Sequence, residues 1–219
     1  MLLRALSATT AAALLLLSLT GCAHDDWSTP RAEPTAVGTP AAGFLPETEP
    51  SPEATVTPAD GSWHGVSPSD GYRVVLLTSG SDATTGVLNT AVEEWASHEQ
   101  VSLRTVAAED SDPIPAIVDA MDMDPDLIVS TGEALIDALA MVTPNHLDVS
   151  FLVLGAELAE PTYNVTAVDW TGAGFRGEGL GSATHFDDSS FTPSRSAAAI
   201  RAGATAVLTG MTGVVIWID

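Results

Sequence analysis

From Tyr72 onward, continuous apolar runs alternate with segments whose apolar residues recur at helical spacing. The apolar runs predict buried strands, and the spaced segments predict amphipathic helices. The predicted strands cover 72–78, 101–107, 126–131, 149–155, 164–170 and 213–218. The predicted helices cover 84–100, 112–123, 133–142 and 194–208. Strands that alternate with helices pair in parallel through right-handed crossovers. We therefore expect an α/β fold over residues 71–219, with a doubly wound, mostly parallel sheet in flavodoxin-like order.

The first 22 residues have a different pattern, in which Arg4 precedes an apolar run from Ala5 to Leu19. A cationic start, an apolar centre and small residues before a cut site are typical of a secretory signal. The run is shorter than the roughly 20 residues that a membrane-spanning helix needs. Its end, Leu19-Thr20-Gly21-Cys22, resembles the lipobox of bacterial lipoproteins, in which Cys22 becomes the lipid-carrying amino terminus. The alternatives are an ordinary secretory signal with an incidental cysteine and a buried apolar helix.

We thus expect a signal peptide over residues 1–21, lipidation of Cys22 and a position on the extracytoplasmic face of the cell membrane. Residues 22–70 lack a sustained apolar period, and they contain 8 of the 14 prolines. Such composition buries too little apolar surface to offset the entropy of ordering. It predicts a disordered tether, in which Trp27, Phe44 and Trp63 are isolated apolar residues.

The charge of the chain excludes several functions. The chain contains seven arginines, no lysine and 29 acidic residues, which gives a net charge of -22 and a pI near 4.1. A chain this acidic offers no cationic cluster to phosphate backbones, so we expect no nucleic-acid partner. Contact with the membrane is expected only through the lipid on Cys22. The single cysteine excludes disulfide frameworks.

No pattern of catalytic or metal-binding residues stands out. The sequence has no Gly-x-Ser-x-Gly elbow, and its five histidines lack zinc-site spacing. Residues 172–177 read Gly-x-Gly-x-x-Gly, but Asp187 and Asp188 follow too early for a dinucleotide site. The acidic residues at 122–133 resemble a calcium loop, except that Leu127 stands where glycine is required. We expect no enzyme activity, metal or cofactor.

Three segments carry a family resemblance. They are 126–132 (Asp-Leu-Ile-Val-Ser-Thr-Gly) before an acidic amphipathic helix, 149–154 (Val-Ser-Phe-Leu-Val-Leu) and 164–168 (Asn-Val-Thr-Ala-Val). They resemble the amino-terminal lobe of the basic membrane protein (BMP) family, which are lipid-anchored solute-binding proteins of ABC importers, several of which take nucleosides. The resemblance covers residues 72–218 and implies a lobe of the type I periplasmic-binding-protein kind. It also implies a small polar solute and an ABC permease as partners.

Members of that family continue from a strand like 213–219 into a second lobe, and the ligand is clamped between the two lobes. On this resemblance, a second lobe would come from another polypeptide, a homodimer would complete the site, or solute capture would be lost. We also expect the last strand to form an edge of the sheet that is open to a partner strand.

The carboxyl ends of parallel strands meet at one edge of a sheet, and this edge gives the candidate site. The resemblance matches Asp82 and Asn89 to the ligand loop of the family, with Leu88 at the position of a stacking phenylalanine, and Asp137 to a hydroxyl-binding carboxylate. The candidate ligand-binding residues are Ser79, Gly80, Ser81, Asp82, Asn89, Gly132, Glu133, Asp137, Asp169 and Trp170. Alternatively, Asp82 caps a helix, Asp137 is a solvated helical residue and Trp170 fills the core.

Two functions of different classes follow. The first is a lipid-anchored solute-binding or ligand-sensing protein, and the second is a non-catalytic scaffold that binds another envelope protein. An oxidoreductase that uses the glycine-rich loop is a third reading, which the pattern supports only weakly.

Overall fold

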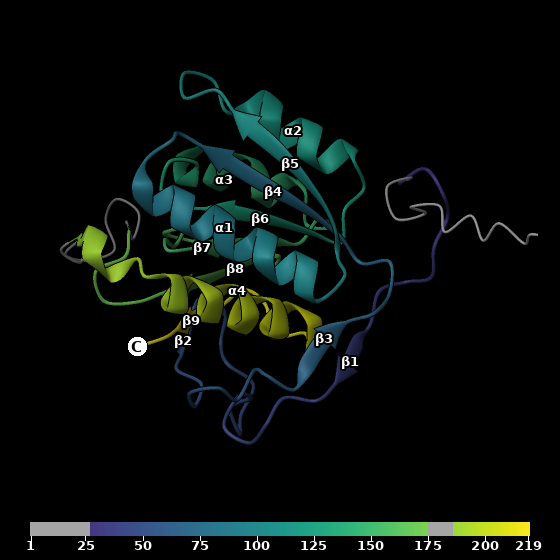
Figure 1. Ribbon diagram of the computed structural model, residues 1–219, viewed down its shortest axis with the longest axis vertical. Coiled ribbons are helices and arrows are strands. Elements are labelled where there is room, and N and C mark those ends of the chain that lie inside the picture. The colour runs from purple at the N-terminus through teal and green to yellow at the C-terminus, as the bar shows by residue number, and fades with distance from the viewer. Residues whose placement is uncertain (1–26, 175–185) are drawn as a thin grey trace, which may run out of the picture.

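The computed structural model describes residues 27–174 and 186–219. It contains a seven-stranded sheet in the order β2-β9-β8-β7-β6-β4-β5 (Figure 1). The strands of this sheet are β2 (Thr55–Val56), β4 (Arg73–Ser79), β5 (Ser102–Ala108), β6 (Leu127–Thr131), β7 (Phe151–Leu154), β8 (Val165–Asp169) and β9 (Val215–Trp217). Every neighbouring pair is parallel. The predicted α/β fold with flavodoxin-like order is therefore confirmed.

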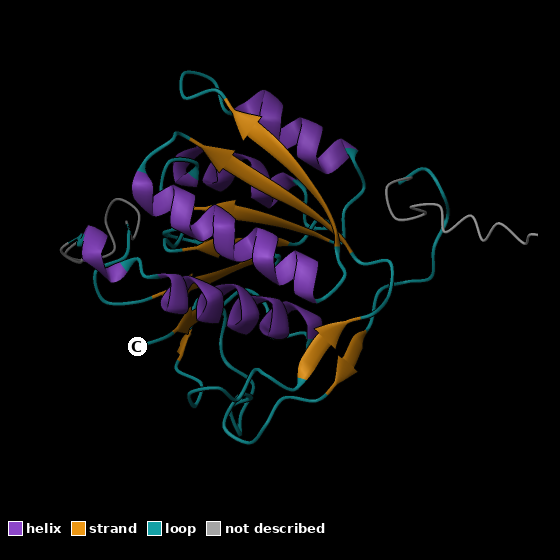
Figure 2. Ribbon diagram, in the orientation of Figure 1, coloured by secondary structure: helices purple, strands orange, loops and turns teal. Residues whose placement is uncertain are grey.

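Helices cover both faces of the sheet (Figure 2). They are α1 (Ala83–His98), α2 (Ile114–Asp122), α3 (Ile136–Val142) and α4 (Pro193–Leu208), with short 3-10 turns at Thr143–Asn145 and Asp188–Ser190. The helices α1 and α4 pack together on one face, and α2 and α3 contact each other on the opposite face. This arrangement is the doubly wound architecture that the alternating pattern predicts.

The interior strand β4, which lies between β6 and β5, shows why such strands appear as apolar runs in the sequence. Val74 and Leu76 belong to the core beneath α1 and α4, whereas Val75 and Leu77 belong to the core beneath α2 and α3. Successive side chains of a strand point to opposite faces, and here both faces are covered. All four side chains are fully buried.

Two helix starts differ by two or more residues from the sequence-based expectation. The helix predicted from residue 133 begins at Ile136, because Gly132 has a positive φ of 72° and the chain turns before it becomes helical. The helix predicted from residue 112 begins at Ile114, next to two prolines. The predicted N-cap of the last helix is confirmed, since the Thr192 hydroxyl accepts a hydrogen bond from the Arg195 amide at 3.2 Å.

Residues 27–70 do not form the expected disordered tether. β1 (Ala36–Gly38) pairs antiparallel with β3 (Val66–Pro68), and the side chains of Trp27, Phe44 and Trp63 are 8%, 1% and 4% exposed. Burial of these three large aromatic side chains contributes to offsetting the entropy of ordering a proline-rich segment. The expectation is therefore wrong for residues 27–70, while the predicted signal peptide and Cys22 lie outside the described residues.

The last strand is not an open edge of the sheet either. β2 pairs in parallel with β9, and Val56 lies opposite Ile216. The segment that composition assigned to a tether thus supplies the strand that covers this edge. Within residues 27–174 and 186–219, no helix is both long enough and apolar enough to cross a membrane.

Candidate functional site

A cleft opens at the carboxyl ends of β4, β6 and β7. It has a volume of about 340 Å³ and is lined by Asp82, Ala83, Thr84, Thr85, Gly132, Glu133, Ala134, Gly155, Phe186, Asp188 and Phe191. The neighbours of β4 are β5 and β6, so the connections that follow β4 and β5 diverge at this point. Open parallel sheets bind ligands at such a switch point, outside the carboxyl ends of their strands. The volume is within the range of small-molecule sites.

Asp82 forms one wall of the cleft and is also the N-cap of α1. Its carboxylate accepts hydrogen bonds from the Thr85 amide at 2.9 Å and from the hydroxyls of Thr85 at 2.8 Å and Thr84 at 2.5 Å. The Thr84 hydroxyl and the Thr85 amide lower the pKa of Asp82 to about 2. Asp82 is therefore anionic at neutral pH, and its oxygens already have partners in the chain.

Two glycines shape the floor of the cleft. Gly132 follows β6 and Gly155 follows β7, with φ of 72° and 75°. A Cβ on Gly155 would lie 2.9 Å from Phe191 Cε1 and 3.2 Å from Leu88 Cδ1. The left-handed conformation and the close packing both require glycine at this position. Leu88, which the sequence resemblance matches to a stacking phenylalanine, is fully buried beneath this floor.

Two phenylalanines provide the apolar wall. Phe191 is 6% exposed and lies with its ring centroid 5.5 Å from that of Phe186, which is 40% exposed. Phe191 is supported from behind by Trp170, whose ring meets it edge-on at 5.1 Å. Trp170 is fully buried, and its indole N–H donates to the Ser190 hydroxyl at 3.0 Å. Trp170 therefore fills the core, as the alternative interpretation stated, and it does not line the cleft.

The cleft contains three of the ten candidate residues, namely Asp82, Gly132 and Glu133. The expectation that the other seven meet there is wrong. Ser79 donates from its hydroxyl to Asp110 at 2.8 Å, toward the end of β5. Gly80 and Ser81 are exposed in the loop before α1 and do not line the cleft.

Asn89 has a structural role. Its amide donates to the Thr78 hydroxyl at 3.0 Å and accepts from the Thr131 hydroxyl at 2.7 Å. Asn89 thus joins α1 to the ends of β4 and β6, and these bonds occupy both ends of its amide.

The two remaining carboxylates are also outside the cleft. Asp137 is exposed in the first turn of α3, a helix on the opposite face of the sheet from α1. Asp169 is 1% exposed and accepts a hydrogen bond from the Trp170 amide at 2.8 Å. The carboxylate at the end of β8 is therefore hydrogen-bonded to the backbone of the next residue.

Two glycines of the Gly-x-Gly-x-x-Gly motif, Gly172 and Gly174, allow close packing of the chain. A Cβ on Gly172 would lie 2.9 Å from Ser190 Cβ, and one on Gly174 would lie 2.9 Å from the Gly155 carbonyl oxygen. The Gly174 amide donates to that same carbonyl at 2.9 Å. The chain after β8 thus crosses over the end of β7. The rest of the motif lies outside the described residues.

The electrostatic character of the cleft is acidic. Asp82, Glu133 and Asp188 line it, and none of its lining residues is cationic. Within residues 27–174 and 186–219, no group of three His, Cys, Asp or Glu side chains is arranged to hold a metal ion. The carboxylates are therefore suited to accept hydrogen bonds from hydroxyl or amine groups of a solute.

Sequence reasoning missed Gly155 and the contribution of the segment after β8. Phe186, Asp188 and Phe191 belong to a loop without regular periodicity, so no pattern placed them at the site. One signal was available, because Phe191 directly precedes the Thr192 N-cap, a position where apolar residues often pack inward.

Comparisons with known proteins show only remote likeness. No protein-family model matches the chain, and no curated protein matches it. Similar solved structures include ABC transporter system solute-binding proteins from Aeropyrum pernix K1, at 18% identity and a TM-score of 0.40, covering 46% of this chain and 29% of that chain. A putative lipoprotein fragment from Peptoclostridium difficile 630 has 14% identity and a TM-score of 0.46, covering 64% of this chain and 99% of that chain.

A third similar structure is a transcriptional activator of the comK gene from Bacillus halodurans, at 17% identity and a TM-score of 0.39. It covers 45% of this chain and 35% of that chain, so this protein spans about a third or less of the first and third of these structures. All three TM-scores are below 0.5, so these likenesses carry no argument about function.

Proposed function

We propose that this protein is a lipid-anchored, extracytoplasmic solute-binding protein of the kind that serves ABC importers, and that it catalyses no reaction. The observation that carries the proposal is the cleft of about 340 Å³ at the switch point of the sheet. The lipobox that ends at Cys22 supports the anchor and the extracytoplasmic location. The resemblance to the BMP family supports the link to import.

The chemistry of the cleft favours a small polar solute that is neutral or cationic. Asp82, Glu133 and Asp188 repel anions and accept hydrogen bonds from hydroxyls. Phe186, whose ring is 40% exposed, offers a face on which a base or the apolar side of a sugar packs. This ring replaces the stacking residue that is lost at Leu88. Nucleosides and sugars fit these features better than their phosphorylated forms.

A second function is favoured by a specific observation. Asp82, Asn89 and Asp169 all direct their polar atoms to partners within the chain. Of the three carboxylates that line the cleft, Asp82 caps α1, whereas Glu133 and Asp188 could bind a solute without the loss of that cap. This pattern agrees with a scaffold lipoprotein that retains the fold and has lost solute capture.

Thermal denaturation in the presence of solutes separates the two functions. The protein from Ala23 onward is heated with adenosine, uridine, ribose or glucose, and with adenosine monophosphate as the anionic comparison. A solute that binds the native state raises the melting temperature in a concentration-dependent way. We expect an upward shift with at least one neutral solute and a smaller shift with the phosphorylated one.

A matched pair of variants assigns the shift to the cleft. Glu133→Gln changes a carboxylate inside the cleft, and Asp137→Asn changes an exposed carboxylate outside it. The solute-induced shift should fall at least several-fold in Glu133→Gln and stay unchanged in Asp137→Asn. Equal responses of the two variants, or no shift with any neutral solute, would contradict solute binding at this cleft and favour the scaffold function.

A further inference from the structure

The first described residues of the chain are fixed to the sheet by a tryptophan. The Trp27 indole N–H donates to the Ser102 hydroxyl at 2.7 Å. The guanidinium of Arg104 lies 4.4 Å from the ring centroid of Trp27, and that of Arg73 lies 5.6 Å from it. Trp27 is 8% exposed and belongs to the core beneath α2 and α3. These contacts make Trp27 an anchor in the domain itself.

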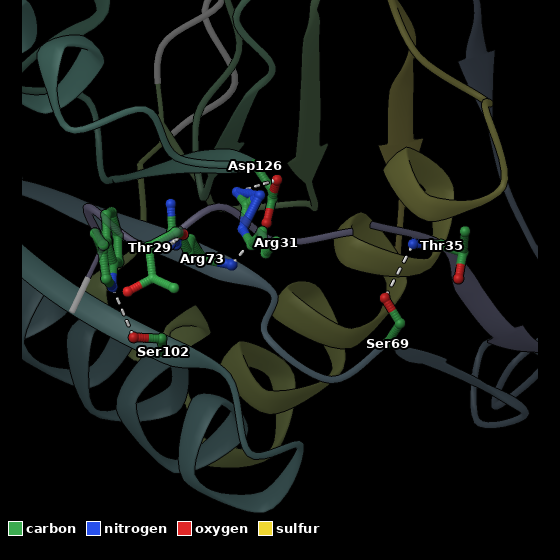
Figure 3. Close-up of polar contacts among 8 residues, drawn as sticks. Thr29, Arg31, Thr35, Ser69, Arg73, Ser102 and Asp126 are labelled. Carbon is green, nitrogen blue, oxygen red and sulfur yellow. Dashed lines mark hydrogen bonds and ion pairs between the residues drawn. The ribbon is translucent and has the colours of Figure 1, made fainter. Parts of the chain in front are cut away.

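Polar contacts continue this attachment along residues 27–35, which we call the strap (Figure 3). The Arg73 guanidinium donates to the Thr29 carbonyl at 2.8 Å, and the Arg31 guanidinium pairs with the Asp126 carboxylate at 2.5 Å. Asp126 also accepts from the Arg73 amide at 2.8 Å. Burial raises the pKa of Asp126 above its ordinary value, although Arg73 and Arg31 stabilise the carboxylate.

All of these partners lie at the amino edge of the sheet. Arg73 begins β4, Ser102 begins β5, and Asp126 directly precedes β6. The cleft follows the carboxyl ends of β4, β6 and β7. In Figure 1 the arrowheads of β4 and β5 point to the left, and the purple strap lies to the right, where these strands begin. The strap and the cleft are therefore at opposite edges of the sheet.

The proposed lipid attachment site, Cys22, is close in sequence to the first residue of the strap, Trp27. Four residues separate Cys22 from Trp27, so five Cα-to-Cα steps join them and reach about 17 Å when fully extended. We infer that the strap sets the resting orientation of the domain on the bilayer, with the amino edge of the sheet toward the lipid surface and the cleft away from it, so that delivery of a solute to a permease requires the domain to turn. This inference rests on the proposed lipidation of Cys22.

Exposed apolar side chains at the same edge suit this orientation. Leu147 and Tyr163 are 39% and 60% exposed, and they lie in the segments that precede β7 and β8. The Asn164 amide joins these segments by donating to the His146 and Val149 carbonyls at 3.0 and 2.9 Å. Tyrosine is enriched at the membrane interface, where its ring and hydroxyl meet apolar and aqueous surroundings.

The orientation can be tested with two labelled positions on helix α1, because this helix begins at the cleft and ends at the amino edge of the sheet. Ala83, its first residue, and Ser97, near its end, are both exposed. Fourteen residues of helix separate them by about 21 Å. A cysteine is introduced at one or the other position of the full lipoprotein and labelled with a donor dye, since the acylated Cys22 has no free thiol. The protein is then reconstituted into phosphatidylcholine vesicles that carry a headgroup acceptor dye.

We expect energy transfer to the acceptor to be several-fold more efficient from Ser97→Cys than from Ala83→Cys. A second form contains a twenty-residue Gly-Ser insertion between His24 and Asp25, which lengthens the tether and leaves every contact of the strap intact. In this form the ratio of the two efficiencies should fall to about one. Equal efficiencies without the insertion, a higher efficiency from Ala83→Cys, or a ratio that the insertion does not change would overturn the inferred orientation.

Mass analysis of the amino-terminal peptide distinguishes this failure from failure of the proposed function. An acylated Cys22 together with equal efficiencies contradicts the orientation and leaves the lipid anchor in place. An unacylated Cys22 and a protein that does not sediment with the vesicles contradict the lipid anchor, and the orientation with it.

Discussion

At the residue scale, Asp82 has two roles that compete for the same oxygens. The carboxylate caps α1 through the Thr85 amide, and it also lines the cleft. A solute that binds to Asp82 must share oxygens that already accept three hydrogen bonds from Thr84 and Thr85. Asp82 therefore contributes more to the shape of the cleft than to its free hydrogen-bonding capacity.

Asp82→Ala should lower the free energy of unfolding by about 1 kcal/mol at pH 7, because the N-cap is lost. The pKa of Asp82 is lowered to about 2 in the folded protein. A lowered pKa stabilises the fold above the pKa of the unfolded chain, about 3.9, and this stabilisation is lost as the pH falls through the folded value. Urea denaturation between pH 7 and pH 2 should thus show the difference between wild type and variant shrinking below about pH 4.

The matched control is Asp119→Ala, which removes an exposed carboxylate from α2. Its effect should stay within about 0.5 kcal/mol at every pH, as for most surface substitutions. A pH-independent loss of stability in Asp82→Ala would show that the charged carboxylate is not the group that caps the helix.

The candidate site was predictable as an edge of the sheet and only partly as a set of residues. Gly132 and Glu133 come directly after one predicted strand and Asp82 lies in the loop after another, so strand order alone places them at the cleft. Asn89 and Trp170 have the right residue types, but their hydrogen bonds are directed into the protein. The hydrogen-bond partner of a side chain depends on tertiary packing, and residue type and spacing do not reveal it.

At the scale of elements, α4 lies unusually close to the sheet. A Cβ on Gly203 would lie 2.6 Å from Leu152 Cδ1 on β7 and 2.8 Å from Val168 Cγ2 on β8. A glycine in the interior of a helix costs stability unless close packing requires it. Here the absence of a side chain lets the helix backbone approach two strands.

Gly203→Ala should therefore destabilise the protein by roughly 1–3 kcal/mol, because a methyl group overpacks this contact. Gly86 in α1 is the matched control, since no atom lies within 4 Å of the position of its Cβ. Gly86→Ala should stabilise the protein by about 0.5–1 kcal/mol through helix propensity. Chemical denaturation of the two variants checks the opposite signs, and a stabilising Gly203→Ala would contradict the close approach of α4.

Strands were the easiest elements to predict, and helix starts were the hardest. β4, β6 and β7 are covered on both faces, so each contains an unbroken apolar run in the sequence. The start of α3 was missed by three residues, because the turn from Gly132 to Leu135 has apolar residues at helical spacing without helical backbone. Apolar periodicity shows which residues are buried, and it does not show where backbone hydrogen bonding begins.

At the scale of the whole molecule, residues 27–70 enlarge the domain beyond its predicted boundary. Phe44 and Trp63 join the core beneath α1 and α4, and the Thr205 hydroxyl of α4 donates to the Trp63 carbonyl at 3.1 Å. Composition could not predict this, because proline content reports the average behaviour of a segment. The burial of single aromatic residues depends on cavities that only the folded domain presents.

The neighbours Phe44 and Leu45 test this enlarged domain. Phe44 is 1% exposed and Leu45 is 48% exposed. Phe44→Ala should lower the free energy of unfolding by about 3–5 kcal/mol, whereas Leu45→Ala should change it by less than about 0.5 kcal/mol. Guanidinium denaturation followed by tryptophan fluorescence measures both changes. Small and equal effects would show that the segment behaves as a tether after all.

The pairing of β2 with β9 has a consequence for export. Val56, from an early part of the chain, lies in register opposite Ile216, from the last strand. Contacts between such distant segments form late, because a very large loop must close first. A polypeptide that is threaded through a secretion channel cannot complete its sheet until the residues around Ile216 have emerged. If the chain is exported as proposed, this edge of the sheet is therefore among the last parts of the domain to form, after almost all of the chain has been delivered.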